Sequence, residues 1–439
     1  MTELKQKGFT IVELLIVIVV IAILAAITII AYNGISTRAK IVTIQSDLSN
    51  DRTLIESSNA SSGTYPGSTA AAGLKSSPGN TVNYFTALGR YCVTVSNASI
   101  PSVYRVSSTN NIGLGTCWTV SSYVNNGQGS ADGASSVAQF NIPQGIAFDA
   151  AGNLYVADSA NHRIRVVSPS GIVSTLAGST PGNVDGTTAN AKFNYPGGVA
   201  VDSSGNVFVA DSDNHSIRKI TPGGAVSTFA GSTSGVAGAT NGTGTAARFN
   251  YPEDIAIDSV GNIYVADTYN HTIRKINSAG VVTSLAGQYS GFNDGTGTAA
   301  SFSYPQQLSV DLAGNVYVAD TNNCAIRIVS PAGVVTTLAG SATCGDQDGI
   351  GSAAKLNRPN AIVLGNDNAV YITDTNNNKI KRVLLDGTVT TIAGNGGQGN
   401  TNGAGEVAQF SYPAGIAFDV SGNIYVSDQL NNGIRKLNL

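Results

Sequence analysis

Six aspartates recur at one repeated position between residues 158 and 428, and each has a basic residue seven positions later. Such acid–base pairs could carry proton transfer or form structural ion pairs. A catalytic site on a repeated scaffold breaks the symmetry, whereas this pattern is kept six times. We therefore expect turn capping and ion pairs within hairpins rather than catalysis. The pairs are Asp158–Arg165, Asp211–Arg218, Asp267–Arg274, Asp320–Arg327, Asp374–Lys381 and Asp428–Arg435.

The three histidines of the chain occupy one equivalent position in consecutive repeats. They are His162, His215 and His271, and Cys324, Asn378 and Asn432 take that position in the other repeats. Imidazole is a common zinc ligand, but zinc needs all its nitrogen ligands within about 2 Å. Equivalent points of neighbouring repeats should lie farther apart than that. We expect histidines that bond to nearby backbone, and neither a metal site nor a cofactor.

A further set of aspartates stands three residues before a Gly-Asn pair in the first turn of five of the six repeats; the fifth repeat has Gly365-Asn366-Asp367-Asn368 there instead. This spacing is typical of turns in which glycine adopts a positive φ. One carboxylate per turn is too few for calcium, which takes six or more oxygen ligands. Phosphate-binding loops, zinc-finger spacings and nucleophile elbows are absent from the sequence. The set comprises Asp149, Asp202, Asp258, Asp311 and Asp419.

The aspartates and histidines named above belong to a sequence unit that is repeated six times. The prolines of the six copies are spaced by 53, 56, 53, 54 and 54 residues. Each copy alternates four short apolar strands with tight turns, as in residues 145–178, and this pattern predicts one blade of an all-β propeller. The prolines are Pro143, Pro196, Pro252, Pro305, Pro359 and Pro413.

The amino-acid sequence of the copies resembles that of NHL repeats, as in Asn161-His162-Arg163-Ile164-Arg165. The resemblance covers residues 130–439 and implies a six-bladed propeller; it says little about function, because propellers serve as binding modules and as enzymes. RNA-binding NHL domains use a basic face. Residues 132–439 contain 16 Lys and Arg against 22 Asp and Glu, so we expect no nucleic-acid partner.

The sixth copy stops after its third strand, so its blade lacks an outer strand. Residues 119–125 precede the first copy and have the pattern of such a strand. We therefore expect residues 119–125 to close the last blade, because closure removes an open sheet edge. The propeller then spans residues 119–439.

The N-terminal part begins with a polar segment, residues 1–8, followed by an apolar run at residues 9–31. A helix of 23 residues is about 35 Å long, enough to span a bilayer. Glu13 is the one charged residue in the run, and a carboxylate in hydrocarbon indicates a functional role. Beyond the run, Ile41, Ile44, Leu48 and Ile55 predict an apolar helix stripe, with Asp47, Asp51 and Arg52 between them.

The run Lys7-Gly8-Phe9-Thr10-Ile11-Val12-Glu13 resembles the class III signal of type IV pilins and pseudopilins. The resemblance implies that prepilin peptidase cuts between Gly8 and Phe9 and that Phe9 becomes N-methylphenylalanine. It also implies that Glu13 lies near the N-terminal amine of a neighbouring subunit. Both charges lose water on assembly and need each other, so the pair would fix the register between subunits. We expect a long helix over residues 9–60 and a small head over residues 61–118.

Four cysteines in an exported chain indicate disulfides. Cys92 and Cys117 bracket strands of the head, which resembles the disulfide loop of pilins. Cys324 and Cys344 lie in two loops of the fourth blade that open on the same face. We expect the pairs 92–117 and 324–344.

The expected architecture is an α+β pilin, with a long helix and a small antiparallel sheet, followed by an all-β six-bladed propeller. The expected protein is a non-enzymatic subunit of a type IV pilus-like filament on the bacterial cell surface. It would be anchored in the inner membrane before the assembly machinery adds it to a helical homo-oligomer. The propeller would present a binding or adhesion surface for a glycan, a protein or another surface. The alternatives are a pseudopilin of a type II-like secretion system and a membrane-tethered propeller lyase or hydrolase, for which the three histidines would be tested.

Overall fold

The structure is a computed structural model that describes residues 40, 43–57, 74, 77–78, 80–87, 90–97, 100–107, 113–114 and 118–438. The chain divides into two compact units, residues 1–115 and 116–439. Gly8, Phe9, Glu13 and Cys117 lie outside the described residues. Among the described residues no helix is both long and apolar enough to cross a bilayer.

The first unit contains a helix over residues 43–57 and one antiparallel sheet. Ile44, Leu48 and Ile55 are fully buried, as their spacing along one helix face predicts. The strands follow one another in the sheet in chain order. They are β1 (Asn80–Ala87), β2 (Arg90–Asn97), β3 (Ile100–Ser107) and β4 (Gly113–Leu114).

Asp47, which stands between the apolar stripe residues of this helix, is buried. Its carboxylate accepts hydrogen bonds from the backbone N–H and the hydroxyl of Ser77, at 2.9 and 2.8 Å, and from the amide of Asn80 at 2.8 Å. Buried carboxylates need such donors. Asp47 therefore ties the helix to the segment that enters β1.

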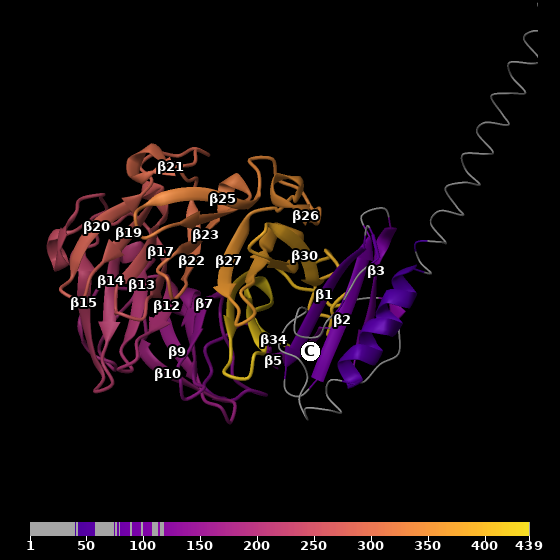
Figure 1. The fold of residues 1–439 in the computed structure, drawn as a ribbon. Coiled ribbons are helices and arrows are strands. Elements are labelled where there is room, and N and C mark those ends of the chain that lie inside the picture. Colours follow the sequence, from indigo (N-terminus) through magenta and orange to yellow (C-terminus); the bar gives the residue numbers. More distant parts are fainter. Residues whose placement is uncertain are drawn as a thin grey trace, which may run out of the picture. The chain divides into compact units, whose positions relative to one another are not determined.

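Six antiparallel sheets make up the second unit and follow one another around a ring (Figure 1). The innermost strands are β7 (Pro143–Phe148), β12 (Pro196–Val201), β17 (Pro252–Ile257), β22 (Pro305–Val310), β27 (Pro359–Leu364) and β32 (Pro413–Phe418). The second strands are β8 (Leu154–Asp158), β13 (Val207–Asp211), β18 (Ile263–Asp267), β23 (Val316–Asp320), β28 (Val370–Asp374) and β33 (Ile424–Asp428). The third strands are β9 (Arg163–Val167), β14 (Ser216–Ile220), β19 (Thr272–Ile276), β24 (Ala325–Val329), β29 (Lys379–Val383) and β34 (Gly433–Asn438).

The outer part of each sheet has two strands, where the sequence predicts one. The fourth strands are β10 (Ile172–Gly178), β15 (Ala225–Gly231), β20 (Val281–Ala286), β25 (Val334–Gly340), β30 (Thr388–Ala393) and β5 (Thr119–Val124). The fifth strands are β6 (Gly133–Ala134), β11 (Gly186–Thr187), β16 (Gly242–Thr243), β21 (Gly295–Thr296), β26 (Gly349–Ile350) and β31 (Gly403–Ala404). Two residues are too short to give a period-2 pattern, so the fifth strand left no sequence signal.

Short 3-10 helices occupy two kinds of turn. Those in the second turn of each blade are η1 (Ser159–Asn161), η2 (Ser212–Asn214), η4 (Thr268–Asn270), η6 (Thr321–Asn323), η8 (Thr375–Asn377) and η9 (Gln429–Asn431). Those after a fifth strand are η3 (Gly244–Ala246), η5 (Gly297–Ala299) and η7 (Gly351–Ala353).

The ring closes through β5, which lies between β34 and β31 in the last sheet (Figure 1). Val124 pairs with Ile434, and Val120 pairs with Leu437. The sixth sheet thus takes its fourth strand from residues that precede the first repeat. The apolar cores lie between sheets: one combines Ala157 of the first blade with Val209 of the second. A blade therefore buries its apolar face only against its neighbours.

Candidate functional site

The six repeated acid–base pairs are buried inside the blades. Asp211 Oδ2 lies 2.7 Å from Nη1 of Arg218, and both side chains have no exposed surface. Burial raises the pKa of Asp211 to about 6, against the lowering effect of Arg218, so the carboxylate is charged at neutral pH. The equivalent distances are 2.6–2.9 Å in the other arginine blades and 3.4 Å for Asp374 and Lys381.

These aspartates do not cap the backbone of the 3-10 turn that follows them, contrary to the turn-capping expectation. Asp211 Oδ1 accepts the backbone N–H of Asn194, 17 residues earlier, at 2.7 Å. Asp211 Oδ2 accepts from Asn214 as well as Arg218. The pair thus links three segments of a blade, and its burial keeps it away from any ligand.

The repeated histidine position joins neighbouring blades. His162 Nδ1 accepts the backbone N–H of Tyr195 at 3.1 Å, and Tyr195 has a φ of 47°. His215 and His271 do the same for the next two blades. Burial lowers the pKa of all three imidazoles, which favours the neutral form that can accept this bond. Each histidine serves a different pair of blades, so the structure does not bring the three together.

The other members of that position fill the same role. Asn378 accepts the N–H of Tyr412, and Asn432 accepts the N–H of Ile142, each through its amide oxygen. The Asn432 bond joins the last blade to the first. Cys324 Sγ lies 3.5 Å from the N–H of Arg358 and is also disulfide-bonded to Cys344. The expected pair of Cys92 and Cys117 lies outside what the structure describes.

The first-turn aspartates bond within their own turns. Asp149 Oδ1 accepts the N–H groups of Ala151 and Asn153, and Gly152 between them has a φ of 84°. Asp202, Asp258, Asp311 and Asp419 make equivalent bonds. Among the described residues no group of three or more His, Cys, Asp or Glu could hold a metal ion.

The second turns and the loops between blades lie on one face, which we call the loop face. Asn270 in η4, for example, donates to the carbonyl of Gly238 in the preceding loop. Tyrosines gather there. The ring of Tyr269 lies 4.6 Å from that of Tyr251 and 5.1 Å from that of Tyr304, between ring centroids.

A depression of about 360 Å³ adjoins these rings on the loop face. Tyr269, His271, Gln288 and Tyr289 line it, together with small polar residues. Tyr269 is 48% exposed and Tyr289 is 70% exposed. Two open aromatic faces beside amide and hydroxyl groups suit a ligand with both apolar and hydroxyl surfaces.

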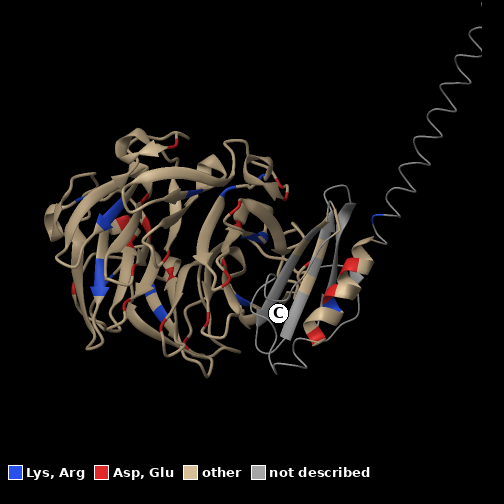
Figure 2. Cartoon of the chain, viewed as in Figure 1, with Lys and Arg blue, Asp and Glu red and all other residues tan. Residues whose placement is uncertain are grey.

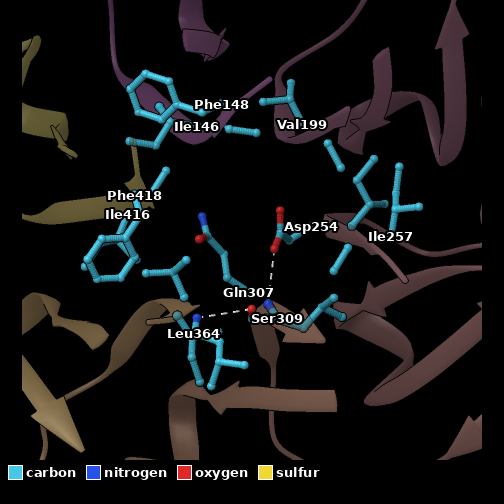
Figure 3. Close-up of a pocket in the computed structure, with 18 of the residues that line it drawn as sticks. Ile146, Phe148, Val199, Asp254, Ile257, Gln307, Ser309, Leu364, Ile416 and Phe418 are labelled. Atoms are coloured by element: carbon cyan, nitrogen blue, oxygen red, sulfur yellow. Dashed lines mark hydrogen bonds between the residues drawn. The ribbon is translucent and has the colours of Figure 1, made fainter. Parts of the chain in front are cut away.

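The central channel is lined by the innermost strands of all six blades (Figure 3). Its cavity of about 360 Å³ is walled mainly by aliphatic and aromatic residues. Asp254 and Gln307 extend into this cavity from neighbouring strands, β17 and β22. One oxygen of Asp254 accepts the N–H of Leu308 at 3.1 Å, and the other points into the cavity. Gln307 Nε2 donates to the carbonyl of Ala414 at 3.0 Å.

A smaller polar cavity of about 180 Å³ shares Gln307 with the channel cavity. Its lining is Gln144, Glu253, Gln306, Gln307, Asn360 and Gln429. Burial raises the pKa of Glu253 to about 7 and that of Asp254 to about 8. These are the only carboxyl groups that line either cavity, and neither lining contains a basic residue.

Sequence reasoning missed this pair, although the repeats contain the signal. The two residues after the repeated proline are Gln-Gly, Gly-Gly, Glu-Asp, Gln-Gln, Asn-Ala and Ala-Gly from the first blade to the sixth. Only the third blade has carboxyl groups there. The symmetry argument that assigned the repeated aspartates to structure would have selected Glu253 and Asp254 as the exception.

Charged residues are few and scattered among the blades (Figure 2). Many of the basic groups are internal, because Arg165, Arg218, Arg274, Arg327 and Arg435 are fully buried. Among the described residues of the blades, the basic side chains therefore do not gather into a stripe of the kind that binds nucleic-acid phosphates.

The NHL repeat profile matches residues 140–167, 193–220 and 249–276, in the first three blades. The ring is an NHL-repeat propeller. A second profile, the prokaryotic N-terminal methylation motif, matches residues 4–29 and includes Gly8, Phe9 and Glu13. The chain thus joins a pilin-type N-terminal signal to an NHL propeller.

Relatives support the propeller. The chain is 31% identical over 321 residues to Protein SUPPRESSOR OF QUENCHING 1, chloroplastic, of Arabidopsis thaliana, covering 68% of this chain and 30% of that protein. It is 31% identical over 327 residues to human NHL repeat-containing protein 2, covering 65% and 45%. The chain therefore spans less than half the length of these two relatives.

Solved structures share the fold. A structural genomics protein of unknown function from Bacteroides thetaiotaomicron has a TM-score of 0.58 at 20% identity, covering 82% of this chain and 90% of that one. An auxiliary nutrient binding protein from the same species has a TM-score of 0.58 at 14% identity, covering 81% and 88%.

Proposed function

We propose that this protein is a subunit of a type IV pilus-like filament that displays its NHL propeller as a binding module for adhesion. The observation that carries the proposal is the N-terminal methylation motif at residues 4–29, in the same chain as a complete six-bladed ring. The first component provides export and assembly, and the second provides a surface.

The motif supports a definite sequence of events. Prepilin peptidase cuts between Gly8 and Phe9 while the apolar run holds the protein in the inner membrane. The assembly machinery then inserts the helix into a helical homo-oligomer, where Glu13 meets the N-terminal amine of a neighbour. The propeller is carried out of the cell with the filament.

We assign the propeller to binding rather than to turnover. The neutral histidines are occupied by bonds between blades, and the repeated aspartates are buried in ion pairs. The loop face instead offers Tyr269 and Tyr289 beside Gln288. Aromatic rings with adjacent hydrogen-bonding groups are suited to a carbohydrate, whose rings have apolar and hydroxyl faces.

Replacing Tyr269 with alanine should weaken carbohydrate binding on the order of tenfold, because it removes a half-exposed ring from the depression. The measurement is binding of the full chain in lipid nanodiscs to an array of bacterial and host glycans. Leu312→Ala is the matched control, since Leu312 is 94% exposed but lies in a first turn away from the depression. If the array gives no ligand, or if Tyr269→Ala binds as well as the parent, the glycan assignment is wrong.

A further inference from the structure

We propose that the central channel binds an organic cation with an apolar body, such as a primary alkylammonium, through the carboxyl group of Asp254. The channel cavity shares no lining residue with the tyrosine depression on the loop face, and the inference does not depend on filament assembly.

The first argument is charge. Asp158, Asp211, Asp267, Asp320, Asp374 and Asp428 are buried in the blades, and each has an arginine or lysine within salt-bridge distance. Asp254 is only 7% exposed, and no basic residue lines its cavity. Its Oδ2 accepts the N–H of Leu308, and its other oxygen points into the cavity (Figure 3). A buried carboxylate is stable when a cation lies beside it. At Asp254 a ligand in the cavity can supply that cation.

The second argument is the space built around this group. Gly145, Gly198, Ala361 and Gly415 are the small residues that the other blades place at the position of Asp254 and Gln307. A β-carbon on Gly198 would collide with Oδ1 of Asp254, and one on Gly197 would lie 2.9 Å from a carboxylate oxygen of Glu253. The second blade therefore makes room for the carboxyl groups of the third.

The third argument is the chemistry of the walls. The cavity below Asp254 is lined by side chains such as Ile146, Val199, Ile255, Leu308 and Ile416. An apolar body of the ligand would be buried there. The Asp254 carboxyl group also accepts the backbone N–H of Ile255. Calcium prefers six to eight oxygens, whereas the side chains near Asp254 offer its carboxyl group and the carbonyl oxygen of Gln307. The Gln307 amide nitrogen already donates to Ala414, so its oxygen is the atom available to a ligand N–H.

The surrounding groups determine how binding depends on pH. Burial is the main cause that raises the pKa of both Asp254 and Glu253; Glu253, on the same strand, adds to the rise for Asp254, and Asp213 in η2 adds to that for Glu253. The other inner strands add no titratable group to the cavity lining. With a pKa of about 8, Asp254 is mostly protonated in the empty cavity at pH 7. An ammonium ligand favours the carboxylate, so the carboxyl proton passes to the buffer on binding, and affinity rises from pH 6.5 to 8.5.

The test is isothermal titration calorimetry of the full chain in lipid nanodiscs with n-butylammonium chloride, with empty nanodiscs as the blank. We expect one site per chain and, at pH 7, a proton release seen as a heat difference between phosphate and Tris buffers. n-Butanol, with the same apolar body and no charge, should bind at least tenfold more weakly.

Asp254→Asn should reduce n-butylammonium affinity at least tenfold and abolish the proton release, while its amide oxygen can still accept the Leu308 N–H. Gln307→Met, of similar volume, should weaken n-butylammonium binding about three- to tenfold. This variant tests the proposal if Asp254→Asn does not fold. Glu406→Gln removes an exposed carboxyl group outside the cavity and should bind as the parent does. Absence of binding to the parent, or equal binding to Asp254→Asn, would overturn the proposal. Calcium chloride binding that is lost in Asp254→Asn would replace it with a metal site.

Discussion

Replacing Arg218 with leucine should lower the free energy of unfolding of the propeller by about 3–5 kcal/mol. The guanidinium contacts Asp211 at 2.7 Å in the fully buried interior and also donates to Asp185 and to the carbonyl of Lys192. Leucine removes all of these donors and leaves Asp211 buried without a cation. Thermal or urea unfolding of the full chain, followed by circular dichroism, measures the change.

Lys219→Leu is the matched control, because Lys219 is a basic residue on the same strand whose ammonium lies over the ring of Phe208, 5.5 Å from its centroid. It should change stability by less than about 1 kcal/mol. The double variant Asp211→Leu, Arg218→Leu should recover part of the loss, since it no longer buries an unpaired charge. A loss below about 1 kcal/mol in Arg218→Leu would show that the pair does not hold the blade together.

Replacing Glu13 with valine should reduce the protein recovered in sheared filaments at least tenfold, while the amount in the membrane stays the same or rises. Glu13 is the one charge in the apolar run of residues 9–31, and burying it is costly unless it meets the N-terminal amine of a neighbour. Without it the amine would be buried unpaired in the filament, and the register between subunits would be lost.

Immunoblots of sheared and membrane fractions, with antibody against the propeller, measure this effect. Glu3→Val is the control, since Glu3 belongs to the segment that the peptidase removes. Unchanged filament yield in the Glu13 variant would defeat the register argument.

The propeller could be predicted from the sequence because its strand and turn patterns are local and are repeated six times. Each strand has its own apolar pattern, and the missing fourth strand of the last repeat pointed to a strand ahead of the first repeat. In the structure, β5 (Thr119–Val124) pairs with β34 in this place. The buried Asp–Arg pairs also follow a fixed spacing within one hairpin, so the sequence alone identifies both partners of each pair.

The features that were missed depend on which residues meet across blades. Asp254 and Gln307 are 53 residues apart and share the channel only because inner strands surround one axis. The contact of Tyr269 with Tyr304 crosses from the third blade to the fourth in the same way. The burial of Asp47 could not be predicted from its own segment either, because it depends on hydrogen bonds with Ser77, 30 residues away.

The central claim is that the propeller is displayed on a filament made of this chain. Immunogold electron microscopy of intact cells, with antibody against residues 130–439, tests it most directly. The account predicts gold on surface filaments, either along the shaft or at its end, and no filament labelling in cells that lack the gene. Gold confined to the cell envelope, with no labelled filament, would contradict it.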